Sequence, residues 1–309
     1  MNTLKKYNFN FAQRTAIMLF CILICLMIGQ LITSIIAGAV NPELFNNLDQ
    51  LKPEMTKEIT LLKSLQFISA LFTFVFPPII IGSLFGNNIL SFLQLNRSPK
   101  ILYYILTIIF IFSVLPGMNI IIMLNKAIRF PESMKAIELS LQGMEESGLR
   151  MTEIMLTGSG TLNLITNILI MAVLPAIGEE FMFRGLIQKH LIEWTKKPHL
   201  AIILSAVIFS AVHFQFYGFF PRVLLGMLFG YLVYYSGSLW PAIFAHFFNN
   251  LMAVLSYHFS SSTIGNTEID SFGTTNSDIY FVFAGLVVAV FIGRYLFKKQ
   301  RIKTENAVN

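Results

Sequence analysis

Eight apolar runs, each about long enough to cross a bilayer, most constrain what this chain can fold into. A helix that spans the hydrocarbon core needs about 20 mostly apolar residues. Such runs, some of them marginal, occupy residues 15–39, 64–86, 101–125, 160–188, 199–216, 219–236, 238–258 and 279–297. The strict alternation of a β-barrel is absent. The sequence therefore predicts an all-α fold, a polytopic membrane helix bundle of about eight transmembrane helices, located in the cell membrane as a multi-pass protein.

The composition supports this class. Hydrophobic residues make up 55% of the chain and charged residues 12%, whereas soluble chains average about 25% charged. The net charge of +6 does not predict a nucleic-acid partner, because the basic residues lie between and beyond the apolar runs, where they meet lipid headgroups. The expected partner is the bilayer. Cys21 and Cys25 lie one helical turn apart and are expected to be packed or lipid-facing thiols rather than a disulfide.

The charges between the runs predict the orientation. An excess of Lys and Arg marks the cytoplasmic side of a membrane protein. With both termini inside, the outside loops carry eight basic and twelve acidic residues, and the inside segments carry thirteen basic residues and two acids. The thirteen are Lys5, Lys6, Arg14, Arg97, Lys100, Lys189, Lys196, Lys197, Arg294, Lys298, Lys299, Arg301 and Lys303. We therefore expect an N-in, C-in topology.

The predicted organisation has three parts and no separate soluble domain. Residues 1–159 form three N-terminal helices with outside loops, residues 160–258 a four-helix core, and residues 259–309 an outside loop, the last helix and a basic cytoplasmic tail. The outside loop 126–158 contains an amphipathic stretch, 134–156, for which an ordinary surface helix is favoured over a lid.

Small residues and prolines are expected to shape the spans. Gly226 and Gly230 indicate close helix packing in the sixth span. Kinks are expected at Pro77-Pro78 and at Pro175, which lies four residues before Glu179, and Pro116-Gly117 is expected to end or kink the third span.

A cluster of charges lies inside the fourth run. Glu179, Glu180 and Arg184 interrupt a stretch from Thr161 that has no other charge. Charges in a membrane helix cost at least a few kcal/mol and mark a functional site by default. At a spacing of four, Glu180 and Arg184 share a helix face and are expected to pair, while Glu179 points about 100° away. One glutamate is then neutralised and the other is free for chemistry.

Two further polar clusters follow in later runs. Phe209 and His213 are four residues apart in the fifth run, and His246 and Asn250 in the seventh, so that each pair is expected on one helix face. The turn near residues 196–198 is almost equally far from Glu179 and His213, which predicts that these two side chains face each other in a helical hairpin. The set suits hydrolysis of an amide by activated water, with His246 and Asn250 as donors to the oxyanion. A zinc ion held by Glu179, His213 and His246 is left open.

The three clusters resemble the motifs of one protein family. They read EEFMFR at 179–184, FSAVH at 209–213 and HFFNN at 246–250. In this order they are similar to the EExxxR, FxxxH and HxxxN motifs of the CPBP intramembrane proteases, also called the CAAX protease and bacteriocin-processing, or Abi, family. The resemblance covers about residues 165–255. It implies an eight-helix fold and a site like that of type II CAAX endopeptidases.

The resemblance also implies roles and substrates. Glu179 and His213 would activate water, and His246 and Asn250 would form the oxyanion hole, with Glu180 and Arg184 in the same site. Family members are often labelled metalloproteases, and a glutamate-dependent mechanism without catalytic metal, which we favour, is also proposed. The cofactor is therefore unknown. The substrate is expected to be a membrane-associated peptide or protein, either a CAAX-type prenylated chain or a bacteriocin-like peptide.

Two other classes of function compete with an endopeptidase. One is a non-catalytic membrane protein of the same family, an immunity factor or scaffold. The other is a proton-coupled transporter, which is disfavoured because the chain shows no inverted repeat.

Overall fold

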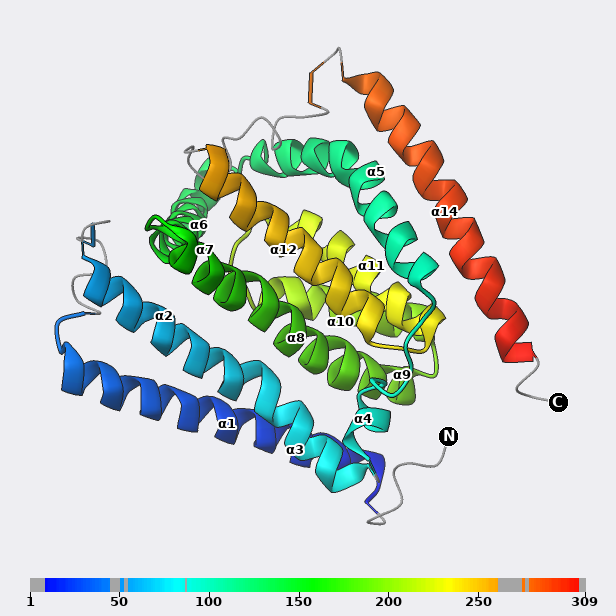
Figure 1. Ribbon diagram of the computed structural model, residues 1–309, viewed down its shortest axis with the longest axis horizontal. Coiled ribbons are helices and arrows are strands. Elements are labelled where there is room, and N and C mark those ends of the chain that lie inside the picture. The colour runs from blue at the N-terminus through cyan, green and yellow to red at the C-terminus, as the bar shows by residue number, and fades with distance from the viewer. Residues whose placement is uncertain are drawn as a thin grey trace.

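The computed structural model describes residues 9–44, 51–52, 55–86, 88–260, 274–275 and 278–305 of the 309-residue chain. All regular structure in these residues is helical, which confirms the all-α prediction (Figure 1). The predicted outside loop 259–278 lies largely beyond the described residues, as do Lys5 and Lys6.

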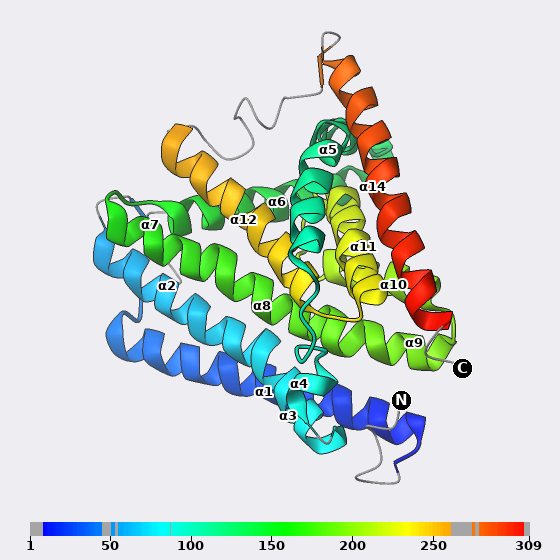
Figure 2. The same cartoon turned by 45° about the vertical axis from the view of Figure 1, so that its right-hand side comes forward.

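The N-terminal helices form one side of the bundle. Helix α1 spans Phe11–Val40 and packs against α2, Thr56–Ala70. A π-helical segment, Leu71–Val75, connects α2 to α3, Phe76–Phe85, and the short α4, Ile89–Phe92, follows. Figures 1 and 2 both show α1 and α2 side by side, with α2 next to α8.

The core of the bundle is a long helical rod and the helices that cross it. The rod runs without a break from residue 161 to residue 195, and α10, α11 and α12 pack on it and on one another. Its parts are α7 (Thr161–Ile168), a π segment (Leu169–Val173), α8 (Leu174–Glu180), a second π segment (Phe181–Gln188) and α9 (Lys189–Thr195). The crossing helices are α10 (Pro198–Ala211), α11 (Phe219–Ser236) and α12 (Trp240–Ser260).

Three more helices complete the bundle. Helix α5, Ile101–Lys126, packs on α12, α11 and α14. Helix α6, Lys135–Leu156, is the amphipathic stretch that the sequence predicted. Helix α14, Ile279–Glu305, lies along the outside of α5 in both views (Figures 1 and 2).

Among the described residues, five helices are long and apolar enough to cross a membrane, which makes the chain a multi-pass membrane protein. They are Phe11–Val40, Thr56–Phe85, Ile101–Lys126, Thr161–Thr195 and Phe219–Ser236. The predicted run 199–216 is shorter in the structure, because α10 ends at Ala211 and Phe214 takes a left-handed conformation with φ of 55°. The N-in, C-in direction and the three-part division stay predictions.

The prolines for which kinks were predicted lie in two kinds of surroundings. A π segment ends two residues before Pro77 and another ends two residues before Pro175, and each helix then continues through the proline. A proline lacks an N–H and its ring displaces the carbonyl four residues back, so a locally wider helix accommodates it. Pro116 lies inside α5, and the ribbon of α5 changes direction along its length (Figure 1).

Gly226 and Gly230 allow close packing around α11, as predicted. A Cβ atom on Gly226 would lie 3.0 Å from the Cβ of Ala206 in α10, and one on Gly230 would lie 2.5 Å from Oε1 of Gln188. Without these side chains, the backbone of α11 reaches both α10 and the rod.

Lys63, which lies in the predicted outside loop just before the run at 64–86, is a buried cation. It lies within α2, and its Nζ donates to Oδ1 of Asn163 at 2.8 Å and to Oδ1 of Asn167 at 2.7 Å. Asn167 in turn donates to the carbonyl of Leu156 at the end of α6. The ammonium therefore ties together α2, α6 and α7.

Replacing Lys63 should destabilise the protein. Lys63→Met leaves the two asparagine oxygens without their donor, at a cost of about 1–3 kcal/mol for a buried unsatisfied group. The apparent melting temperature in detergent should fall, whereas Lys57→Met, at an exposed position of the same helix, should leave it unchanged. Equal melting temperatures for the two variants would contradict this account.

Candidate active site

The centre of the site is a buried chain of charged and polar side chains. Glu180 is fully buried, and its Oε1 accepts from NH1 of Arg184 at 2.8 Å and from Nδ1 of His246 at 2.9 Å. The predicted pairing of Glu180 with Arg184 is present, and the contact with His246 joins the rod to α12. Because a carboxylate only accepts, Nδ1 of His246 carries its proton toward Glu180.

Arg184 is held on several sides. Its NH2 donates to the carbonyl of Gly226 at 3.0 Å. Its guanidinium carbon lies 4.6 Å from the ring centre of Phe209 and 5.3 Å from that of Phe229. A guanidinium between two aromatic rings gains cation–π attraction, which is stronger in a desolvated site. These contacts fix where Glu180, and through it His246, can lie.

His246 points its second ring nitrogen toward Glu179. Its Nε2 lies 3.8 Å from Oε2 of Glu179, and its ring stacks on Phe229 with the centres 5.1 Å apart. Glu179 and Glu180 are adjacent in sequence and approach the same imidazole from its two nitrogens. One carboxylate orients the ring, and the other lies near the nitrogen that remains available.

His213 also has one nitrogen occupied. Its Nδ1 lies 2.8 Å from the carbonyl oxygen of Phe209, so Nδ1 donates and Nε2 keeps a lone pair in the neutral ring. His213 and Phe209 therefore lie next to each other, as their spacing of four predicted. However, α10 ends at Ala211, and His213 lies in the turn after it. The prediction that His213 lies within the helix was wrong.

A cavity of about 320 Å³ gathers four of the six predicted site residues. Glu179, His213, His246 and Asn250 all line it. Glu180 and Arg184 are not among its lining residues and support it from behind. Asn249 also lines the cavity and donates from Nδ2 to Oδ1 of Asn250 at 3.3 Å.

Other charged residues line the cavity that sequence reasoning did not assign to it. They are Lys126 at the end of α5, Glu145 on α6 and Arg222 in the first turns of α11. Oε2 of Glu145 accepts from the backbone N–H of Tyr217 at 3.1 Å. Helix α6, for which an ordinary surface helix was favoured, thus contributes a side chain to the cavity wall. The amphipathic pattern of α6 could be recognised in the sequence, but the segments against which α6 packs could not.

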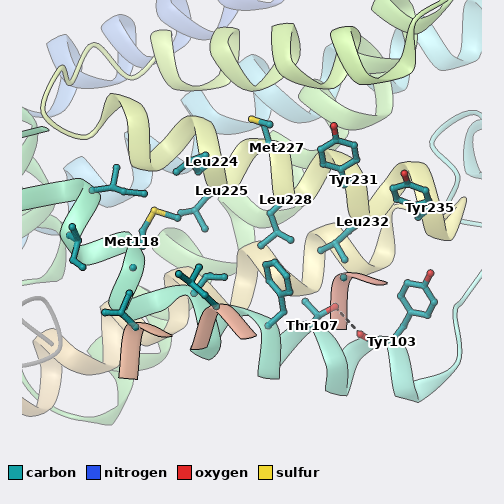
Figure 3. A pocket seen from close by; sticks show the side chains of 18 residues that line it. Tyr103, Thr107, Met118, Leu224, Leu225, Met227, Leu228, Tyr231, Leu232 and Tyr235 are labelled. Atoms are coloured by element: carbon teal, nitrogen blue, oxygen red, sulfur yellow. Dashed lines mark hydrogen bonds between the residues drawn. The ribbon is translucent and has the colours of Figure 1, made fainter. Parts of the chain in front are cut away.

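A second, larger cavity of about 510 Å³ lies between α5, α11 and α14. Its described lining residues include no charged side chain, and Leu225 of α11 borders both cavities. Figure 3 shows Leu225, Leu228 and Leu232 of α11 facing the side chains of α5, among them Thr107 and Tyr103. An apolar chamber therefore adjoins the polar one.

The grouping of possible ligand side chains in the described residues bears on the zinc alternative. Among them, no three His, Cys, Asp or Glu side chains are grouped so that they could hold a metal ion. Nδ1 of His246 is bound to Glu180 and Nδ1 of His213 to a backbone carbonyl, which leaves each ring a single nitrogen. A free Nε2 on a histidine whose Nδ1 donates to a carboxylate or a carbonyl is also what a metal ligand offers, so the zinc alternative stays open.

The helices and the cavity define a multi-pass membrane protein with a buried glutamate–histidine centre. Residues 161–252 match the family model described as type II CAAX prenyl endopeptidase, Rce1-like. This match confirms the predicted resemblance and includes all six predicted site residues. No curated protein and no solved structure matches the chain.

Arg184 should be essential to the fold. Arg184→Met leaves the carboxylate of Glu180 buried without its cation, which costs about 3–5 kcal/mol. The apparent melting temperature in detergent should fall steeply. Arg14→Met is the matched control, since Arg14 pairs with the partly exposed Glu193, where an ion pair is worth about 0–1 kcal/mol. An equal fall in melting temperature in both variants would mean that the buried Glu180–Arg184 pair stabilises the fold no more than the partly exposed pair does.

Proposed function

We propose that this protein is an intramembrane endopeptidase that hydrolyses a peptide bond with water activated by Glu179 and His213. The observation that carries the proposal is the convergence of Glu179, His213, His246 and Asn250 on one cavity. Amide hydrolysis needs a base, a positioned water and donors for the oxyanion. The family match at residues 161–252 supports the same class of reaction.

The first step is attack of water on the scissile carbonyl. Water lies between the carboxylate of Glu179 and Nε2 of His213, which is free to accept because Nδ1 donates to Phe209. Glu179 takes one proton as the water oxygen bonds to the carbonyl carbon. The tetrahedral intermediate then collapses, the C–N bond breaks, and the proton on Glu179 passes to the leaving amine. The products are a new carboxylate terminus and a new amine.

His246 and Asn250 stabilise the oxyanion. The Nδ2 group of Asn250 is a donor in any state, whereas Nε2 of His246 donates only in the imidazolium, because Nδ1 already holds a proton toward Glu180. With His246 charged, Arg184 and His246 balance Glu179 and Glu180, so the four buried groups are neutral together. Such balance is what makes buried charge tolerable. Removing one oxyanion donor typically costs roughly 10²–10³ in kcat.

The apolar cavity favours a lipid-modified substrate over a bacteriocin-like one. It adjoins the catalytic cavity at Leu225, and none of the lining residues that the structure describes is charged. A chain attached near the scissile bond would bury apolar surface there, worth about 25 cal/mol per Å². A CAAX-type prenylated peptide has this form.

Glu179→Gln should abolish proteolysis while the fold is retained. The amide cannot take the proton from water, and Glu179 is not part of the Glu180–Arg184 pair. Peptide termini in membranes of cells with the wild-type chain should include some absent from cells with the variant at matched expression. Glu146→Gln, at an exposed acid of α6, should match wild type.

The same variant separates the competing classes. A scaffold or immunity factor would keep its phenotype with Gln at position 179, and a transporter would lose proton movement instead of proteolysis. Identical termini under several growth conditions would overturn the endopeptidase proposal.

Proteolysis should persist after chelation. We propose a metal-independent reaction, because the glutamate and the histidine nitrogens can supply the base and the donors without a Lewis acid. Purified protein treated with a strong zinc chelator should cleave a farnesylated reporter peptide at an undiminished rate. Loss of cleavage on chelation, with recovery on adding zinc, would contradict the metal-independent step.

A further inference from the structure

A small cavity with charged walls lies at the end of the bundle where α1 begins. Its volume is about 40 Å³, and its polar lining residues are Arg14 of α1 and Lys189, His190 and Glu193 of α9. Figures 1 and 2 show the beginning of α1 at the same end of the bundle as α4 and α9, and α6 and α7 at the other end. None of the described residues that line this cavity also lines the catalytic cavity. The proposed reaction therefore does not explain these charges.

Arg14 has a donor that its ion pair does not use. NH1 and NH2 of its guanidinium donate to the two carboxylate oxygens of Glu193, at 3.2 and 2.5 Å. The third nitrogen, Nε, is buried and has no hydrogen-bond partner among the described residues. A buried donor without an acceptor is destabilising. On a side chain that lines a cavity, such a donor points to a ligand that supplies the acceptor.

Lys189 is a second cation on the cavity wall. Its Nζ donates to the carbonyl oxygen of Phe92 at 2.7 Å and lies 4.3 Å from the centre of the Phe92 ring. An ammonium has three N–H donors, so the Phe92 carbonyl uses one of them. Glu193 is already engaged by Arg14. Two cations and one carboxylate thus belong to the described wall of the cavity, an excess of positive charge that favours an anionic ligand.

The size of the cavity and its free donors favour a phosphate group. The carboxylate of Glu193 occupies the forked end of the Arg14 guanidinium, which leaves the single N–H of Nε and the ammonium of Lys189. A lysine binds phosphate as a point charge. One water needs about 10–15 Å³, so a cavity of about 40 Å³ has room for a group of a few atoms. A phosphate has this size, and its several oxygens can accept from both helices at once.

The cavity lies where lipid phosphates are expected. Arg14 and Lys189 belong to the basic residues that predict the cytoplasmic side of the protein, and basic pockets between membrane helices on that side bind anionic headgroups. Leu19, Phe20 and Leu23, which follow Arg14 along α1, are exposed. They offer acyl chains an apolar surface next to the cavity.

We propose that this cavity binds a phosphate group through Nε of Arg14 and Nζ of Lys189. The phosphate belongs to an anionic phospholipid or is inorganic phosphate, since the two share the chemistry that these donors recognise. The exposed apolar surface of α1 favours the lipid. A bound phosphate would join α1 to α9, two helices that lie far apart in the sequence. The inference goes beyond the proposed function, because no residue of the catalytic cavity takes part.

The test measures lipid binding to the whole protein in a neutral detergent. The probes are phosphatidylglycerol and a galactosyl diacylglycerol with the same acyl chains, which differ in that only the first has a phosphate. Native mass spectrometry gives the dissociation constant of each lipid. Wild type should bind phosphatidylglycerol roughly ten- to a hundredfold more tightly, the range expected for a charge-assisted hydrogen bond.

Substitutions of single charges identify the site. Lys189→Met should reduce the ratio of the two dissociation constants to near one, and Lys189→Arg should keep most of it. Lys197→Met, at an exposed position on the same predicted side, should keep the full ratio. Glu193→Gln should increase the ratio, because it removes a negative charge from the cavity wall and frees the guanidinium of Arg14. A purely structural role for Glu193 would not strengthen binding, so a ratio no higher than that of wild type would count against the site.

Inorganic phosphate separates the two sources of the ligand. Its effect on the apparent melting temperature in neutral detergent is compared with that of sodium chloride at equal ionic strength. A specific rise in wild type that is absent from Lys189→Met, with equal binding of the two lipids, would identify the free anion as the ligand. Preference for phosphatidylglycerol would identify the lipid. Equal binding of the two lipids together with no effect of inorganic phosphate, or a full lipid ratio in Lys189→Met, would overturn the proposal.

Discussion

The buried contacts of Glu180 with Arg184 and His246 are what the rest of the site depends on. Glu180 is fully buried, so its charge is tolerable only with a cation and hydrogen bonds around it. Arg184 supplies the cation from one turn further along the rod, and His246 supplies a second donor from α12. The imidazole is thereby fixed by a carboxylate, as in hydrolases where an acid orients a histidine.

Helix packing gives this chain of contacts its geometry. The glycines of α11 expose carbonyl groups to the rod, where Gly226 accepts from Arg184 and Gly230 from Gln188. The second π segment of the rod contains both donors. π-Helical segments are rare in proteins, and those that occur often lie at functional sites. Arg184 and Gln188 of the rod therefore bind the backbone of α11 directly.

The sequence predicted the helices and the three motifs because both signals are local. Hydropathy over about 20 residues marks a span, and a spacing of four marks one helix face. The environments of Lys63, Glu145 and Arg222 were not predictable, because each depends on which distant helix packs beside it. The sequence around Lys63 is that of an exposed loop, because its partners Asn163 and Asn167 lie far away in the chain. His213 was placed in a helix because its run stays apolar beyond Ala211.

The charges of the cavity bear on the choice between a hydrolase and a proton carrier. In the proposed reaction a proton moves from water to Glu179 and then to the leaving amine, and the four buried groups return to their starting charges within one turnover. Net proton transport needs instead a site that opens alternately to both sides, commonly between repeated halves of the chain. The rod, α11 and α12 are locked together by Arg184, Gln188 and His246. A locked site of this kind suits chemistry at a fixed point better than alternating access.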